Sequence, residues 1–189
     1  MLALSLVSWA VLGWAATEGP VTLPRIAVSA LHLSVALAIA RRAPVLRVGS
    51  PRALMAALPA LLLAGLAFRL AAPLAEWPIL IQVLFLVGAC IAVTSFLALG
   101  ENFAVLPALR GVVSRGPYAY MRHPAYAGEL MMMLACLSSK PSPVALAVLL
   151  TAVPFVRLRI ITEERLLGEV ETYRNYAQQV PYRLVPGMW

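Results

Sequence analysis

The chain has 189 residues, of which 62% are hydrophobic and only 12% are charged, and its mean hydropathy is +0.87. Soluble domains are usually about 45 to 50% apolar, so this composition excludes an ordinary soluble domain and indicates a polytopic membrane protein. The formal charge of +7 does not indicate a nucleic-acid partner, because the basic residues lie between apolar runs instead of along one stripe or tail.

Four apolar stretches in the first half of the chain predict four membrane spans. A helix needs about 20 apolar residues to cross the hydrocarbon core, and short links rich in proline, glycine and charge separate the stretches. They run from Leu2 to Ala16, from Leu23 to Ala40, from Ala53 to Ala75 and from Pro78 to Leu99.

A fifth apolar region runs from Ala125 to Val156, but polar residues and prolines interrupt it between Ser138 and Pro143. The interruption predicts a helical hairpin with two legs of 13 residues, which barely cross the membrane, or one span plus a re-entrant segment. The expected fold class is therefore all-α: a polytopic integral membrane bundle of about five transmembrane helices, four spans plus the hairpin, with a cytoplasmic C-terminal helical region.

The arginines predict the orientation of this bundle. The link from Arg41 to Arg52 carries four arginines and no acid, whereas the link at Glu76 carries no base. The positive-inside rule places the arginine-rich link in the cytoplasm. If the chain is followed through its predicted spans, residues 100–124 and residues 157–189 lie on the same side of the membrane as this link. We expect the polar motifs to face the cytoplasm, at the inner membrane if the host is a prokaryote.

The first candidate motif lies between the fourth span and the hairpin. Gly116-Pro117 predicts a turn, Pro124 suits the first position of a helix, and Gly128 allows close approach of a backbone or a ligand. The motif also offers donors for a carboxylate and aromatic faces for a cation, from Tyr118, Tyr120, Arg122, His123 and Tyr126. An interfacial belt of arginine and tyrosine explains the same composition.

The second candidate motif predicts an amphipathic helix that leaves the bilayer. It contains Arg157, Arg159, Glu163, Glu164 and Arg165. Charges four residues apart are also typical of ordinary surface pairs. Two adjacent glutamates beside a site rich in arginine and tyrosine would suit a ligand with ammonium, sulfonium and ribose diol groups, which are the groups of S-adenosylmethionine.

Together these motifs resemble the isoprenylcysteine carboxyl methyltransferase family and the related phospholipid methyltransferases. The resemblance rests on an RHPxYxG element that begins at Arg122, on the pair Glu163-Glu164, and on a tyrosine-rich tail ending Val180-Pro181. It covers roughly Leu99 to Pro186. It implies one membrane domain over residues 1–189, with four spans in 1–99. Residues 100–189 would form the catalytic region from a cofactor-binding loop, the hairpin and a cytoplasmic tail.

The resemblance also implies roles for individual residues. The pocket for S-adenosylmethionine would be lined by His123, Pro124, Tyr126 and Gly128, together with Tyr118. Glu163 and Glu164 would hold the polar groups of the cofactor. The catalytic set would be Glu163 with Arg159 or Arg157, and the choice between the two arginines stays open because the spacing departs from the family pattern.

The chemistry of methyl transfer agrees with this set of residues. The electrophile is already activated, so no metal is expected, and a carboxylate acceptor needs only an arginine to orient it. An amine acceptor needs a base, either His123 or a glutamate. We expect a lipophilic or prenylated substrate, most simply an isoprenylcysteine-type carboxylate, that enters from the membrane lipids. The expected groove lies between the hairpin and the fourth span, lined by Ala127, Leu130 and residues 131–133.

Two other functions remain open at this point. The ending Val180 to Gly187 also resembles the carboxy terminus of sterol reductases that use NADPH, although the glutamate pair disfavours a 2′-phosphate. A non-catalytic, lipid-binding membrane protein would explain the polar segments as interfacial. A lipid amine, as in phospholipid N-methylation, is the alternative acceptor within the methyltransferase hypothesis.

Overall fold

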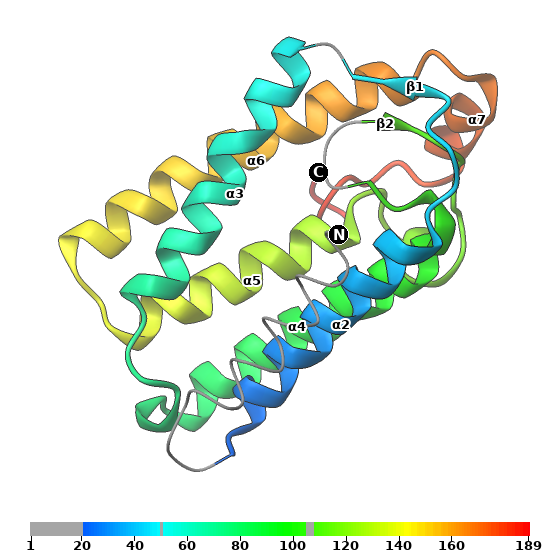
Figure 1. Ribbon diagram of the computed structural model, residues 1–189. Helices are drawn as coiled ribbons and strands as arrows, with labels where there is room; N and C mark the ends of the chain where they lie inside the picture. The colour runs from blue at the N-terminus through cyan, green and yellow to red at the C-terminus, as the bar shows by residue number, and fades with distance from the viewer. Residues whose placement is uncertain (1–20, 50, 105–107) are drawn as a thin grey trace.

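The computed structural model describes residues 21–49, 51–104 and 108–189, and these form a helical bundle with one pair of two-residue strands (Figure 1). The span predicted from Leu2 to Ala16 lies outside the described residues. The helices are α2 (Leu23–Arg41), α3 (Pro51–Leu70), α4 (Ile79–Leu99), α5 (Pro124–Ser139), α6 (Pro143–Leu167) and α7 (Glu171–Gln179). The 3-10 turns are η1 (Leu74–Glu76), η2 (Gly100–Asn102) and η3 (Gly116–Ala119), and the strands are β1 (Arg47–Val48) and β2 (Ala108–Leu109).

Three of the described helices, α2, α4 and α6, are long and apolar enough to cross a membrane. Large apolar side chains face outward along the bundle, such as Leu80 at 78% exposed and Leu150 at 66% exposed, as a hydrocarbon solvent permits. Helix α3 has 20 residues and also carries an apolar stretch, Leu58–Leu70. The structure therefore confirms a helical membrane bundle, and the count of five spans stays a prediction.

The interruption of the fifth apolar region is confirmed, but the predicted lengths of its two legs are wrong. Helix α6 begins at Pro143, where the Ser142 hydroxyl accepts a hydrogen bond from the backbone N–H of Ala145 at 3.1 Å. It then continues for 25 residues, because neither glycine nor a further proline follows Pro154 before Gly168. The charged residues of the second motif therefore lie on the last turns of α6 instead of on a separate helix.

Helix α4 packs against both α2 and α5, while α3 packs against α6, so that α5 lies between the α2–α4 pair and the α3–α6 pair (Figure 1). The crossing of α4 with α5 is close because two glycines meet there. A Cβ added to Gly128 would lie 2.5 Å from the Gly88 carbonyl oxygen, and one added to Gly88 would lie 2.8 Å from the Gly128 carbonyl oxygen. The close approach expected at Gly128 is thus made by the backbone of α4.

The polar segments meet at one end of the bundle. Strands β1 and β2 pair antiparallel, with Arg47 opposite Leu109, and the Ala43 N–H donates to the Glu101 carbonyl at 2.8 Å. These contacts bring the arginine-rich link beside the segment that follows α4. Helix α7 and the end of α6 lie at the same end (Figure 1), so the polar motifs gather at one end of the bundle, and their cytoplasmic orientation stays a prediction.

Candidate active site

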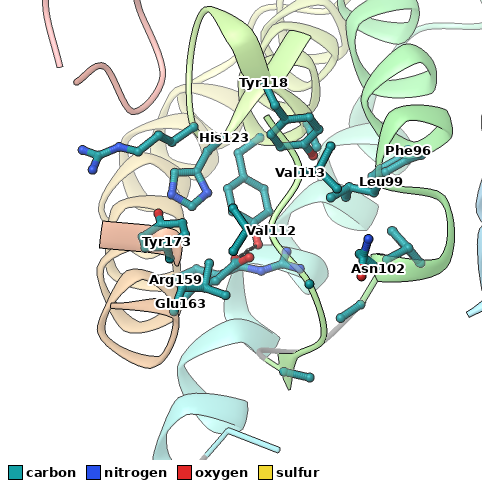
Figure 2. Close-up of a pocket in the computed structure, with 18 of the residues that line it drawn as sticks. Phe96, Leu99, Asn102, Val112, Val113, Tyr118, His123, Arg159, Glu163 and Tyr173 are labelled. Carbon is teal, nitrogen blue, oxygen red and sulfur yellow. Dashed lines mark hydrogen bonds between the residues drawn. The ribbon is translucent and has the colours of Figure 1, made fainter. Parts of the chain in front are cut away.

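A cavity of about 230 Å³ lies at the polar end of the bundle. Its apolar walls come from the end of α4 and the following segment, and its polar wall comes from η3, the start of α5, the end of α6 and α7 (Figure 2). The apolar lining includes Phe96, Leu99, Val112 and Val113, and the polar lining includes Asn102, Tyr118, Arg122, His123, Tyr126, Glu129, Arg159, Glu163, Tyr173 and Tyr176. Residues from both sequence motifs therefore share one enclosed space.

The turn before α5 is built as the sequence predicts. Gly116 has a positive φ of 61°, which glycine adopts without strain, and it starts η3, which carries Tyr118 inward. The Tyr176 hydroxyl donates to the Tyr118 carbonyl at 2.7 Å. Burial raises the pKa of Tyr118 well above its ordinary value and that of Tyr176 to about 12. Both phenols are therefore neutral hydrogen-bond donors at physiological pH.

The chain just before α5 is held by the C-terminal segment. The Arg122 N–H donates to the Tyr182 carbonyl and the His123 N–H to the Arg183 carbonyl, both at 2.9 Å. The Arg122 guanidinium donates to the Pro181 carbonyl at 3.2 Å. Pro124 then opens α5, as predicted. Sequence reasoning missed this pairing, because backbone hydrogen bonds between distant segments leave no side-chain pattern.

The Glu164 carboxylate connects this loop to α6 and to the C-terminal segment. Its oxygens lie 2.7 Å from Arg183 Nε, 3.2 Å from Arg122 Nε and 3.2 Å from His123 Nε2. The Tyr173 hydroxyl donates to the same carboxylate at 3.3 Å. The Glu164 side chain is only 12% exposed and does not line the cavity, so its contacts fix the wall beside the cavity.

Arg159, Tyr126 and Glu163 form the charged wall of the cavity. Arg159 is 4% exposed, and its guanidinium lies 4.7 Å from the centre of the Tyr126 ring. The Tyr126 hydroxyl donates to Glu163 Oε2 at 2.5 Å. The His123 ring stacks on the Tyr126 ring with centroids 5.5 Å apart. Figure 2 shows Arg159, Glu163 and His123 grouped opposite Asn102 and Leu99.

The structure separates the two candidate arginines. Arg159 reaches the cavity, whereas Arg157 is exposed and lies 5.9 Å from the centre of the Trp189 ring. Two residues predicted to line a cofactor pocket, Pro124 and Gly128, are buried in the helix contacts and do not reach the cavity either. Tyr118, His123, Tyr126 and Glu163 do line it.

Glu129 also lines the cavity and was not among the predicted site residues. It lies three residues after Tyr126 on α5, which places both side chains on one face of the helix. The three-residue spacing from Tyr126 was the only sequence pattern that could have indicated Glu129. A single glutamate before an apolar run is also typical of a membrane–water interface, so this pattern is not specific. Within residues 21–49, 51–104 and 108–189, no three histidine, cysteine or acidic side chains gather as a metal site.

The fold and the cavity define a helical integral membrane protein with a site that combines apolar walls and a charged wall. The chain matches the phospholipid methyltransferase family model over residues 78–175, more than half of its length, and it belongs to this family. It is thus a membrane methyltransferase. The family resemblance read from the motifs is confirmed.

Its fold is similar to that of the eukaryotic intramembrane Ras methyltransferase, isoprenylcysteine carboxyl methyltransferase. The two structures superpose with a TM-score of 0.54 at 20% sequence identity, over 98% of this chain and 74% of that chain. No curated protein sequence matches the chain.

Proposed function

We propose that this protein transfers a methyl group from S-adenosylmethionine to a lipophilic acceptor in the cavity beside Arg159. The observation that carries the proposal is the buried group of Arg159, Tyr126 and Glu163 in a chain of a methyltransferase family. Within the single membrane domain, the catalytic region is residues 100–189, with α4 supplying Phe96 and Leu99 to the apolar wall.

The donor set of the cavity fits S-adenosylmethionine. Aromatic rings in the cavity lining, such as that of Tyr118, suit a sulfonium cation, and the Glu163 carboxylate suits an ammonium or a ribose diol. Neutral Tyr118 adds a donor. When bound, this cofactor supplies a methyl group that is already activated. Glu164 lies outside the cavity and holds His123 and Arg122 in position through its contacts with both side chains.

An isoprenylcysteine-type carboxylate is the acceptor that the family resemblance favours. Arg159 would bind and orient such a carboxylate, because a planar guanidinium matches its two oxygens. Burial of Arg159 at 4% exposure strengthens this contact by excluding water. Positioning of the acceptor and exclusion of water would then provide most of the rate enhancement.

A lipid amine is the second candidate acceptor, and one observation favours it. Two carboxylates, Glu129 and Glu163, line the cavity, and either could take the proton that an ammonium acceptor must lose.

The hydrophobic part of the acceptor has a groove available between α5 and α6. The groove has a volume of about 470 Å³ and is lined by Leu130, Met131, Leu134, Leu149, Leu150, Val153 and Pro154. The predicted position between the hairpin and α4 is wrong, because Gly88 and Gly128 pack α5 tightly against α4, but the predicted lining residues Leu130 and Met131 do lie in this groove. We place the site at the cytoplasmic face, since the arginine-rich link lies at the same end.

Calorimetric titration of the detergent-purified protein with S-adenosylhomocysteine, and separately with NADPH, tests this proposal. We expect micromolar affinity for S-adenosylhomocysteine and none for NADPH. Binding of NADPH alone would support the reductase, and binding of neither by folded protein would support the lipid-binding hypothesis. Transfer of a labelled methyl group to isoprenoid acids and amines then identifies the acceptor.

A further inference from the structure

Two arginines lie close to each other at the polar end of the bundle, outside the cavity. Arg110 directly follows β2, and Arg42 directly follows α2. The segments that carry them are joined where β1 pairs with β2 (Figure 1), and the Leu46 N–H donates to the Leu109 carbonyl at 3.0 Å. Neither arginine lines the cavity, so the pair has no part in the site described above.

The Arg110 guanidinium lacks hydrogen-bond acceptors. Its Nε and Nη1 atoms are buried, and neither has a partner among the described residues. The side chain as a whole stays partly exposed, so a ligand can reach it from outside. A charged donor that has lost its water and gained no acceptor is unfavourable. An anion with acceptor oxygens would relieve this.

The charges around Arg110 are mainly positive. Burial lowers the pKa of Arg110, and the neighbouring Arg42 cation lowers it further. In the sequence, residues 41–52 and 100–115 carry six arginines and a single acid, Glu101. Two cations held close together repel each other, and an anion between them reverses the sign of that contribution.

The nearby carboxylates do not neutralise the arginine pair. The Glu101 side chain is exposed, and within the described residues it forms no ion pair with either arginine. Helix α6 also contacts β2, but its two glutamates are bound elsewhere. Glu163 accepts a hydrogen bond from Tyr126, and Glu164 accepts one from Arg183.

The link that carries Arg42 also exposes apolar side chains. Leu46 is 73% exposed and Val45 is 40% exposed, and both lie between Arg42 and Arg47 in the sequence. Exposed apolar residues beside arginines are typical of a chain at the membrane–water interface. Phospholipid phosphates lie at that depth, and a guanidinium matches two phosphate oxygens with parallel hydrogen bonds.

We propose that Arg110 and Arg42 form a binding site for the headgroup phosphate of an anionic phospholipid, in the leaflet at the polar end of the bundle. The phosphate supplies the acceptors that Arg110 lacks and separates the two cations. A headgroup with a net negative charge is favoured over a zwitterionic one, since its phosphate charge is not offset by an ammonium. This lipid binds outside the cavity and is not the methyl acceptor.

The position of Arg110 couples this lipid site to the cavity wall. Ala108 and Gly111 flank Arg110 along the chain, and both line the cavity. The segment packs closely at Gly111, where an added Cβ would lie 2.5 Å from Asn102 Oδ1. A lipid that holds Arg110 therefore also holds this part of the wall.

Native mass spectrometry of the full-length protein in a nonionic detergent tests the inference. Phosphatidylglycerol and phosphatidylcholine with the same acyl chains both contain a phosphate, but only phosphatidylglycerol has a net negative charge. We expect the first phosphatidylglycerol molecule to bind wild-type protein at least about tenfold more tightly than the first phosphatidylcholine molecule, which is the effect of one charged hydrogen bond.

Three variants and one control assign this preference to the arginine pair. Arg110→Gln should reduce the preference about tenfold, and Arg42→Gln should reduce it about fivefold. Arg110→Lys retains the charge and should retain the sign of the preference. Arg69→Gln should leave the preference unchanged, because Arg69 is an exposed arginine in the last turn of α3, at the other end of that helix.

Thermal unfolding separates a lipid site from a structural role of Arg110. In lipid-free detergent, Arg110→Gln should have the Tm of wild type, because the buried nitrogens have no partner to lose. Added phosphatidylglycerol should raise the Tm of wild type more than that of Arg110→Gln. A lower Tm of Arg110→Gln without lipid would show an internal role for Arg110 and would overturn the inference.

Three binding results would also overturn it. They are equal binding of the two lipids by wild-type protein, an unchanged preference in Arg110→Gln, and the same loss of preference in Arg69→Gln. Displacement of phosphatidylglycerol by an equimolar amount of inorganic phosphate would assign the arginine pair to free phosphate and exclude a lipid as its occupant. All of these results leave the proposed methyl transfer standing, because the cavity takes no part in them.

Discussion

Replacement of Glu164 by glutamine should destabilise the polar end of the bundle. The carboxylate binds Arg183 Nε at 2.7 Å and lies 3.2 Å from both Arg122 Nε and His123 Nε2. A hydrogen bond to a charged group contributes about 1.5–3 kcal/mol, and a buried cation left without its partner adds to the loss. Glutamine keeps the shape and one acceptor oxygen but removes the charge.

The magnitude follows from how well each contact is shielded from water. The side chains of Arg122 and His123 are 10% and 5% exposed, so solvent screens little of the interaction energy between each of them and Glu164. Arg183 is 34% exposed, so its contact is discounted for solvent screening. The expected loss is about 3 kcal/mol in the free energy of unfolding, which corresponds to a fall in Tm of about 6–12 °C for a chain of this size.

Thermal unfolding in detergent, followed by tryptophan fluorescence, measures this loss. Glu163→Gln is the matched comparison, because the neighbouring Glu163 lines the cavity and has Tyr126 as its hydrogen-bond donor. We expect Glu163→Gln to lower affinity for S-adenosylhomocysteine with a smaller change in Tm. A Tm for Glu164→Gln within about 2 °C of wild type would refute the claim that this carboxylate holds the wall together.

Three further predictions follow from the same structure. Arg159→Lys should lower kcat/KM about 100-fold, because an ammonium cannot reproduce a planar guanidinium against the Tyr126 ring. The affinity for S-adenosylhomocysteine should change less than about threefold. Full turnover by this variant would remove Arg159 from the site. Gly128→Ala should cost about 1–3 kcal/mol of stability, since its Cβ would lie 2.5 Å from the Gly88 carbonyl oxygen; an unchanged unfolding midpoint in denaturant would contradict this packing. Burial raises the pKa of Tyr176 to about 12, above about 10 in an unfolded chain, so its contribution to stability should persist below about pH 10 and disappear between about pH 10 and 12. A Tyr176→Phe variant should show a flatter decline of Tm across that window, and an identical decline would exclude Tyr176 as a cause.

The sequence predicted the parts of the fold that local chemistry decides. Apolar runs located α2 and α4 to within about two residues, the Gly116-Pro117 pair located the turn, and Pro124 located the start of α5. The gathering of His123, Tyr126 and Glu163 around one cavity was also anticipated, because both motifs were expected on one side of the membrane.

Other features depend on tertiary contacts that no local pattern reports. The choice between Arg159 and Arg157 could not be made from spacing, because only the folded chain shows that Arg159 lies over the Tyr126 ring and Arg157 lies near Trp189. The pairing of Arg122 and His123 with the C-terminal segment uses backbone groups, which every sequence contains.

The distribution of the cavity wall along the chain has a consequence for how the protein is made. The wall takes residues from Val35 to Tyr176, with its polar side chains from Asn102 onward, and it is stabilised by the contact of Arg183 with Glu164. Helices α2, α3 and α4 are inserted during synthesis long before these bracing residues leave the ribosome. A nascent chain therefore has its membrane anchor first and gains a complete cavity only when the C-terminal segment docks. The membrane would be reached well before any methyl transfer begins, so immature chains stay inactive without a separate inhibitor.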